Sequence, residues 1–591
     1  MADIASELSV ACGKAFEALG LDAKLGAVRR ADRPDLADYQ CNGAMAAGKA
    51  ARRNPREIAS EIAEKLKGEP GIADITVAGP GFLNIQITPD LLARRTEEIR
   101  SSEKAGADVM ADTRSIVIDF GGPNVAKPMH VGHLRSAVIG DTLVRLCRFL
   151  GHHVVGDAHL GDWGLQMGQL IVGLSDEQPD LPYFDVSNKG PFPAESPVDI
   201  EDLARLYPLA SGKSKTDEAY RERCQQATAE LQTGRAGYRA LLQHFIDVSV
   251  AALKVDYDKL NVSFDLWKGE SDADPFVAPV IDDVKSRGIA EESDGAWIIR
   301  VAREGDKGKT EMPPFILVNS RGGVGYHTTD LATIFDRVNN LQPKPDLMLY
   351  VVDQRQALHF QQVFRASEKA GYFPEAGLEH IGFGTVNGDD GKPFKTRDGG
   401  TVRLSDLNRM ALEEAEKKIA DANLSSDLSE EEVQDISQKV ALAATRFSDL
   451  QNTRTTDYKF DLERFTSFEG KTGPYLLYAA VRIKSLLRRA KADGNAPGRI
   501  VIESDAERTL ALQLDGFNTA LEQAYVKRMP HFVCEHVYNL AQAFSGFYGA
   551  HPIAAEKDEA RRASRLGLCE AVLNQLETAL DILGIETPER M

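Results

Sequence analysis

The chain has 591 residues, of which 43% are hydrophobic and 27% charged, and its formal net charge is −19. This length predicts several domains, and the composition is typical of a soluble globular protein with an ample core. The acidic balance favours an enzyme that acts on small molecules, but it does not exclude nucleic acid, because only the contacting face has to be basic.

The six cysteines are scattered without C-x-x-C pairs, which argues against a structural zinc site and fits reduced thiols. The N-terminus carries acidic residues early and has no apolar core long enough for a signal peptide. We find no run of about 18 or more apolar residues, so we expect no membrane span. Together these features predict a cytoplasmic protein.

Residues 1–110 are predicted to form a separate domain. Helical stretches at 4–19 and 55–67 flank a polar segment, and strand-like ITVAGPGFLNIQIT follows with a Gly-Pro-Gly turn in its middle. A local basic cluster stands out in this acidic chain and consists of Lys49, Arg52, Arg53 and Arg56. Such a cluster, taken alone, is more often a solvated helix face than a binding site.

The first half of an α/β domain is predicted over residues 111–172. SIVIDF (115–120) is β-branched and apolar, as a buried parallel strand is, and LRSAVIGDTLVRLCRFLG (134–151) has the apolar spacing of a helix. PNVAKPMHVGH (123–133) lies between them. The motif therefore occupies a strand-to-helix turn, where helix N-terminal amides face an anionic ligand.

Two histidines in this turn, His130 and His133, flank Gly132, which keeps the turn small enough for a ring or a phosphate to approach the backbone. Imidazoles can donate to phosphate oxygens as charge builds on them, so the turn suits ATP. Histidines three residues apart are also common as capping or metal-binding residues, and the turn alone leaves these interpretations open.

Residues 173–295 are predicted to form an insertion. EQPDLPYFDVSNKGPFPAESPVD (177–199) is too rich in proline for regular structure, and a helical pattern follows from 200 to about 260. The α/β domain resumes over 296–403 with LMLYVVD (347–353), an apolar run whose carboxyl end should open on a ligand crevice. HIGFGTVNG (380–388) predicts a further strand, and the cationic loop GKPFKTRDGGTV (391–402) follows.

Beyond residue 404 the chain is predicted to be wholly helical, and we divide it into residues 404–465 and 466–591. Ser429 and Glu432 predict a capping box, and a helix should begin near Pro474. Aromatic and basic residues interleave in the last part, namely Tyr475, Tyr478, Arg482, Phe544, Phe547 and Tyr548. Most such aromatic residues in a helical bundle belong to its core.

The run DFGGPNVAKPMHVGHLRSAVIGD (119–141) resembles the HIGH region of class I aminoacyl-tRNA synthetases, and its central part is similar to that of arginyl-tRNA synthetases in particular. Further matches follow in order along nearly the whole chain: GDWGLQMG (161–168), LNVSFDLWKGES (260–271), GGVGYHTTDLA (322–332), GKPFKTRDGGTV (391–402), TSFEGKTGPYLLYAAVRI (466–483) and the ending ETPERM. The chain is thereby identified as a member of the arginyl-tRNA synthetases.

The resemblance implies an α/β fold, a Rossmann-like catalytic domain in two halves with an inserted connective domain. It also implies an N-terminal α/β add-on domain and a C-terminal all-helical anticodon-binding domain. For function, the resemblance implies activation of arginine with ATP, supplied with Mg²⁺, and transfer of arginine to the 3′-terminal adenosine of tRNA(Arg). We expect a monomer without a structural metal. The alternative hypotheses are a class I synthetase for another amino acid and an inactive synthetase-like RNA-binding protein.

Cations should meet the charge that develops on ATP. The resemblance implies that His130 and His133 act from one side of the crevice, beside Gly132. The opposite side should carry the cationic loop, and since this loop departs from the usual KMSKS pattern, the choice among its cations stays open: Lys392, Lys395 or Arg397. Members of the family that lack KMSKS carry a lysine just upstream of the histidines, the position of Lys127 here.

A guanidinium is planar, permanently charged and fork-shaped, so its pocket requires carboxylates and an aromatic face. Asp119 ends the first strand, while Tyr326 and Asp330 are four residues apart and would share a helix face. These three fit the roles, although Tyr326 and Asp330 could also be a helix-surface pair.

By resemblance, Asn124 and His130 would hold the amino and carboxylate ends of arginine, with Gln356 as a further contact. Gly121 and Gly122 replace small hydroxyl residues that are usual in the family, so the resemblance does not assign this wall of the site.

The resemblance also assigns tRNA contacts. It places Arg52 and Arg53 of the N-terminal domain at the outer corner of tRNA. It places Tyr475, Tyr478 and Arg482 near the anticodon, whose unstacked bases need aromatic platforms.

Overall fold

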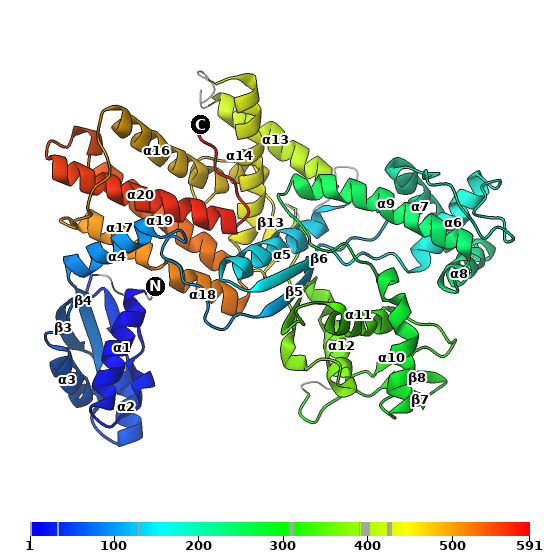
Figure 1. Ribbon diagram of the computed structural model, residues 1–591, viewed down its shortest axis with the longest axis horizontal. Coiled ribbons are helices and arrows are strands. Elements are labelled where there is room, and N and C mark those ends of the chain that lie inside the picture. Colours follow the sequence, from blue (N-terminus) through cyan, green and yellow to red (C-terminus); the bar gives the residue numbers. More distant parts are fainter. Residues whose placement is uncertain are drawn as a thin grey trace. The chain divides into compact units, whose positions relative to one another are not determined.

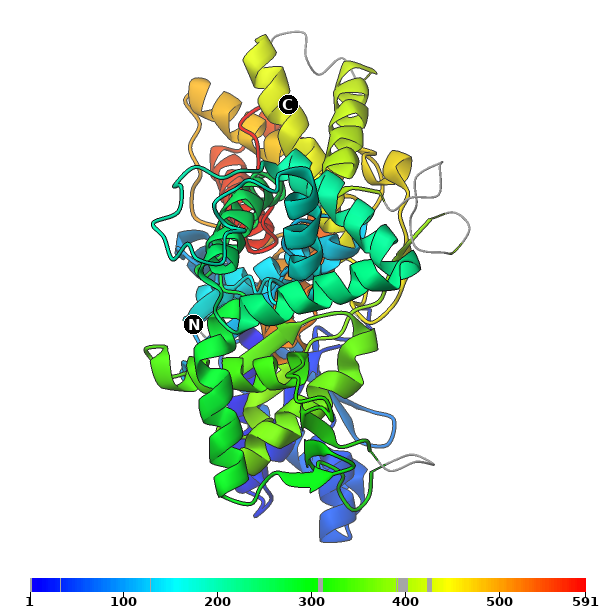
Figure 2. The same ribbon diagram turned by 90° about the vertical axis from the view of Figure 1, so that its right-hand side faces the viewer.

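The computed structural model describes residues 3–31, 33, 35–127, 129–306, 312–388, 391, 402–421 and 428–591 (Figure 1 and Figure 2). The chain forms two compact units, the first from residues 1–109, 418–443 and 466–591 and the second from residues 110–417 and 444–465. Within the described parts, no helix is both long enough and apolar enough to cross a membrane.

The first unit begins with an antiparallel sheet of order β1-β2-β4-β3. Its strands are β1 (Val28–Arg30), β2 (Tyr39–Cys41), β3 (Ile72–Ala78) and β4 (Phe82–Ile87), and its helices are α1 (Ile4–Glu17), α2 (Gly43–Ala51), α3 (Pro55–Leu66) and α4 (Pro89–Ser101). The expected helices and the Gly-Pro-Gly hairpin are confirmed. The intervening segment, expected only to be polar, contains β2 and α2, because Tyr39 and Cys41 alternate inward and the run after them is rich in alanine.

The rest of the first unit is helical. It contains α16 (Gly473–Ala492), α17 (Asp505–Asp515), α18 (Phe517–Lys527), α19 (His531–Ala550) and α20 (Glu559–Ile582), and Phe544 and Phe547 are buried in this bundle as expected. Helices α13 (Leu404–Asp421) and α14 (Glu430–Leu450) contribute residues to both units. The capping box of α14 is confirmed, since the Ser429 and Glu432 side chains each accept from the other residue's backbone N–H at 3.2 and 2.9 Å.

The second unit is organised around a parallel sheet of order β11-β10-β5-β6, formed by β5 (Ser115–Phe120), β6 (His153–Asp157), β10 (Leu347–Val351) and β11 (Leu378–His380). Helix α5 (Val131–Phe149) connects β5 to β6, and α12 (Ala357–Ala370) connects β10 to β11. The chain thus proceeds outward in opposite directions from the central pair β5–β10. Such a switch point opens a crevice at the carboxyl ends of the strands, where ligands bind.

The insertion between the halves contains α6 (Leu165–Glu177), α7 (Ile200–Thr216), α8 (Glu218–Gln232) and α9 (Ala236–Asp258), with the proline-rich segment irregular as expected. It is followed by α10 (Asp274–Ser286), by an antiparallel sheet of β7 (Glu291–Ser293), β8 (Ala296–Ile299) and β9 (Phe315–Val318), and by α11 (Tyr326–Asn340). Figure 1 shows α11 and α12 side by side.

Two expectations about strands were wrong. HIGFGTVNG is not one strand, because β11 ends at His380 and β12 (Val386–Asn387) pairs with β13 (Tyr458–Lys459) in a separate sheet. The region beyond 404 is therefore not wholly helical, because it includes β13; the short helix α15 (Leu462–Phe465) follows. Between β11 and β12, a Cβ on Gly382 would lie 2.0 Å from Oε1 of Gln354.

Candidate active site

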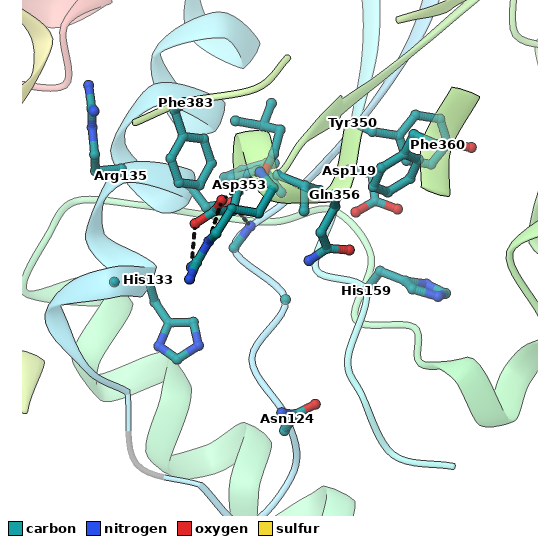
Figure 3. A pocket seen from close by; sticks show the side chains of 18 of the residues that line it. Asp119, Asn124, His133, Arg135, His159, Tyr350, Asp353, Gln356, Phe360 and Phe383 are labelled. Carbon is teal, nitrogen blue, oxygen red and sulfur yellow. Dashed lines mark hydrogen bonds and ion pairs between the residues drawn. The ribbon is translucent and has the colours of Figure 1, made fainter. Parts of the chain in front are cut away.

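A cavity of about 880 Å³ opens at the carboxyl edge of the parallel sheet, where β5 and β10 pair (Figure 3). Its wall comes from both strands, from the N-terminal turns of α5 and α11, and from α12. It brings together eight of the residues predicted for the site: Asp119, Asn124, His130, Gly132, His133, Tyr326, Asp330 and Gln356. In Figure 3, His133 lies on one side of the view, and Asp119, Gln356 and His159 on the other.

The two histidines are fixed by backbone groups of their own turn. Nδ1 of His130, the N-cap of α5, accepts from the N–H of Gly132 at 3.0 Å, and Nδ1 of His133 accepts from the N–H of His130 at 3.1 Å. Each neutral ring therefore carries its proton on Nε2. The expected capping role and the expected role toward a ligand are compatible, because capping uses one nitrogen and leaves the other as a donor.

Both rings are uncharged at neutral pH. Burial lowers the pKa of His133 to about 3, with His130 and Lys127 adding to the effect, and burial and then Lys127 lower the pKa of His130. Lys127 itself is not part of the cavity wall; its Nζ lies 4.7 Å from the centre of the Tyr207 ring in α7. The candidates Lys392, Lys395 and Arg397 lie outside the described residues.

The GDWG (161–164) and GES (269–271) segments are hydrogen-bonded to each other at one side of the site. Asp162 accepts from the N–H of Ser271 at 2.8 Å and from its hydroxyl, and a Cβ on Gly269 would lie 2.5 Å from that carboxylate. On the other side a Cβ on Gly161 would lie 2.1 Å from Oδ1 of Asn124. These glycines thus allow the contacts that place Asn124 in the wall.

The wall formed by Gly121 and Gly122 is made of backbone. Gly121 has a φ of 67°, and a Cβ on Gly122 would lie only 1.9 Å from the carbonyl oxygen of His159. The Gly121 carbonyl accepts a hydrogen bond from the hydroxyl of Tyr257, at the end of α9. No side chain fits at Gly122 without moving the neighbouring segment.

Asp119 is already paired within the protein. Nη2 of Arg337, in α11, contacts Asp119 Oδ2 at 2.6 Å and Asp157 Oδ2 at 2.7 Å, and all three side chains are largely buried. The guanidinium of Arg337 thus neutralises part of the charge that we expected Asp119 to offer a ligand.

Asp330 faces the cavity from the start of α11. Its Oδ2 contacts Nε2 of His359, in α12, at 2.5 Å, and the exposed fractions of the two side chains are 20% and 12%. Tyr326 is 63% exposed at the edge of the cavity, where its ring stacks on His327. Tyr326 and Asp330 lie on one helix and both line the cavity, although the Tyr326 ring is also largely open to solvent.

Wall residues that carry chemistry but were not predicted from the sequence include His159, Glu270, Arg355 and His359. Burial raises the pKa of Glu270 to about 7, and Asp330 contributes to the increase. The His159 ring nitrogens are enclosed and without a hydrogen-bond partner among the described residues. Arg355, whose side chain is 82% exposed, forms a bidentate pair with Asp353 at 2.7 and 2.9 Å.

Comparison with known proteins gives matches along the whole chain. The family descriptions that match are "tRNA synthetases class I (R), catalytic domain" over residues 96–462, "DALR anticodon binding domain" over 476–591 and "Arginyl tRNA synthetase N terminal domain" over 2–87. The chain belongs to the arginyl-tRNA synthetase family.

Relatives of the family agree with this assignment. The chain is 64% identical over 591 residues to an arginine–tRNA ligase of Hyphomonas neptunium and 56% identical over 592 residues to one of Maricaulis maris, with 100% of each chain covered in both cases. The fold is similar to that of the arginyl-tRNA synthetases of Thermus thermophilus and Plasmodium falciparum, each with a TM-score of 0.81, 24% and 23% identity, and 100% of both chains covered.

The residues predicted to contact tRNA lie in the first unit. Arg52 ends α2 with a φ of 53°, and Arg53 pairs with Glu61 at 2.5 Å. On α16, Tyr478 is 41% exposed, while the Tyr475 hydroxyl accepts from Gln542 at 2.9 Å. The guanidinium carbon of Arg482 lies 4.2 Å from the centre of the Tyr548 ring. Tyr478 and Arg482 are exposed to solvent, whereas Tyr475 is half-buried and hydrogen-bonded to another helix of the bundle.

Proposed function

We propose that the cavity at the β5–β10 edge is where this family member activates arginine with ATP and then transfers it to tRNA with release of AMP. The activity is that of an arginine–tRNA ligase: arginine is activated to arginyl-adenylate with release of pyrophosphate, and the arginyl group is transferred to the 3′-terminal adenosine of tRNA(Arg). The observation that carries the site assignment is the cavity's two unlike ends, with neutral histidines at one and carboxylates at the other.

In the first step a carboxylate oxygen of arginine attacks the α-phosphorus, and the bond from that phosphorus to the bridging oxygen of pyrophosphate breaks. The attacking carboxylate is already ionised, so the step needs positioning and charge stabilisation rather than a base. We assign the Nε2–H groups of His130 and His133 to the phosphate oxygens, beside the open backbone of Gly132. Lys127, Lys392, Lys395 and Arg397 are the proposed cations, and Mg²⁺ would arrive bound to ATP.

The other end of the cavity is assigned to the arginine side chain. Asp330 receives the guanidinium, and Tyr326 packs beside it. Asn124 and His130 hold the amino and carboxylate ends, and Gln356 adds a polar contact. Asp119, held by Arg337, closes the floor of the pocket, and Glu270 supplies a further acidic group.

The remaining assignments concern the larger substrate. Arg52 and Arg53 are proposed to contact the outer corner of tRNA, and Tyr475, Tyr478 and Arg482 the anticodon region. We propose the domain limits 1–110, 111–172, 173–295, 296–403, 404–465 and 466–591 as the corresponding functional parts, and a monomeric, cytoplasmic enzyme.

Pyrophosphate exchange into ATP tests the site assignment. Purified protein is assayed with each amino acid, with and without bulk tRNA, and so are variants of the two ends of the cavity. We expect exchange with arginine, lost on changes at either end. Full exchange in folded variants of both ends would place the reaction elsewhere.

A further inference from the structure

The contact between Asp330 and His359 joins two helices that are separate in the sequence. Asp330 belongs to the start of α11 and His359 to the first turn of α12, and both side chains line the cavity. Nε2 of His359 and Oδ2 of Asp330 lie within hydrogen-bond distance, and a hydrogen bond to a charged acceptor is stronger than one between neutral groups. We propose that His359 is a positioning residue for arginine recognition, which fixes the orientation of the Asp330 carboxylate. This inference rests on the proposed role of Asp330.

The geometry assigns the proton of the His359 ring. Nε2 contacts the carboxylate, so it must carry hydrogen to form the bond. Nδ1 is enclosed and without a partner among the described residues. A second proton there would be a buried donor without an acceptor, which is costly. The neutral ring with hydrogen on Nε2 is therefore favoured, and it leaves the negative charge of Asp330 intact for a ligand.

The ring is held in place by its neighbours. The centre of the His327 ring lies 4.6 Å away and that of Tyr326 lies 5.2 Å away, both edge-on to His359, and the Phe360 ring lies at 5.1 Å. These contacts leave the imidazole little freedom to rotate. A fixed donor in turn restricts the terminal torsion of Asp330, which in a free aspartate is broad.

Fixing that torsion matters for recognising a planar fork. One lone pair of Oδ2 is used by His359, while the other lone pair and Oδ1 remain for the two parallel N–H groups of a guanidinium. If the carboxylate rotates, one of these two bonds is lost. Removing the His359 donor should therefore weaken arginine recognition while leaving the ATP end of the cavity unchanged.

Two substitutions separate the donor from the ring. His359→Phe keeps a ring against His327 and Tyr326 but removes the N–H. His359→Gln places an amide N–H close to the former Nε2. Kinetics are measured by pyrophosphate exchange with saturating tRNA, varying arginine and ATP in turn. For His359→Phe we expect kcat/KM for arginine to fall by about 10- to 100-fold with KM for ATP unchanged. His359→Gln should recover most of this loss.

A matched control lies on the same helix. Glu368 of α12 pairs with Arg303 at 2.6 Å outside the cavity wall, so Glu368→Gln removes the charge of a similarly short pair without touching the site. It should leave both KM values unchanged. Should His359→Phe fail to fold, His359→Asn replaces it, because its shorter amide ends near the Nδ1 position and cannot reach Asp330.

The double variant with Asp330→Asn decides how His359 acts. If His359 works through Asp330, the double variant should be no worse than Asp330→Asn alone. Additive losses in the double variant would overturn the inference, and so would equal losses for His359→Gln and His359→Phe. Wild-type kinetics for His359→Phe together with a large loss for Asp330→Asn would also overturn it. A harmless Asp330→Asn would instead overturn the proposed role of Asp330, so the two failures are distinguishable.

Discussion

The two ends of the cavity are held in different ways. At the histidine end, His130 and His133 are fixed by hydrogen bonds to backbone groups of a single turn. At the carboxylate end, Asp119 and Asp330 are fixed by side chains distant in the sequence, Arg337 and His359. The first end depends on local conformation, whereas the second depends on the packing of α11 and α12 against the sheet.

The two kinds of support suit the charges of the substrate groups that we assign to each end. Phosphate charge is redistributed during adenylation, and neutral donors can follow it without attracting other anions beforehand. The guanidinium of arginine carries a permanent charge, so its end needs carboxylates that stay ionised while partly buried, and such groups require partners. The following predictions separate the two ends, from the largest expected effect to the smallest.

The largest effect should come from Arg337→Met, which breaks the internal support of the carboxylate end. Asp119 and Asp157 would then be buried without their cation, and a broken buried pair costs about 3–5 kcal/mol of unfolding free energy. Urea unfolding followed by tryptophan fluorescence measures this, because the tryptophans Trp163, Trp267 and Trp297 all belong to the second unit. Arg303→Met, which removes two solvent-exposed pairs, to Glu368 and Glu375, is the control and should be nearly neutral. Equal stability of the two variants would contradict the prediction.

The next largest effect should come from His133→Ala at the other end. One lost donor to developing charge costs about 10²- to 10³-fold in rate, or about 3–4 kcal/mol. Since its contacts lie within one turn, we expect the loss in adenylation rate without a comparable loss in stability. Single-turnover formation of arginyl-adenylate with saturating substrates measures it. An unchanged rate in the folded variant would remove His133 from the phosphate site.

Asp330→Asn should lower kcat/KM for arginine by at least about 100-fold, about 2.7 kcal/mol. The change keeps the shape but removes the charge and turns one acceptor into a donor that faces the guanidinium. KM for ATP should stay nearly unchanged, which assigns the loss to the carboxylate end. Arginine-dependent exchange with saturating ATP and tRNA is the measurement. A variant within about threefold of wild type would make Asp119 the main carboxylate candidate.

The histidine end was predictable from the sequence because its geometry is encoded in adjacent residues. A buried strand, a small residue and a helix start within about 20 residues define the turn, and β5 and α5 lie where the pattern placed them. The same holds for the β3–β4 hairpin and for the capping box of α14. In each case the decisive contacts join residues only a few positions apart.

The carboxylate end was only partly predictable, because its partners meet through tertiary packing. Asp119 and Asp330 were named from their motifs, but nothing local indicates that Arg337 pairs with the first or His359 with the second. Glu270 belongs to a motif that was recognised, yet its effect on the site depends on burial, which sequence spacing does not give. The split of HIGFGTVNG into β11 and β12 has the same origin, since β12 pairs with a strand about 70 residues later.

Glu270 provides the smallest and most specific test of the carboxylate end. Burial raises the pKa of its carboxyl from 4.5 to about 7, so the free enzyme is partly protonated at neutral pH. A guanidinium favours the carboxylate, so arginine should bind the ionised form better. KM for arginine should then fall as the pH rises, roughly tenfold between about pH 6 and about pH 8. Initial-rate measurements across this range test it, with Glu270→Gln expected to show a much flatter profile.

Because of the same raised pKa of Glu270, we expect the stability of the protein to change with pH in the opposite direction to arginine binding. The two opposite pH dependences together identify Glu270 as the group responsible. Its folded-state pKa is above its ordinary value of 4.5, so the folded protein binds the extra proton between about pH 4.5 and about pH 7. The free energy of unfolding should therefore decrease as the pH rises through this window, while arginine binding becomes tighter. Glu270→Gln should lose both trends together. A histidine whose pKa is lowered by burial, such as His133, would instead lose stability as the pH falls. If both pH dependences persist in Glu270→Gln, another group of the site is responsible for them.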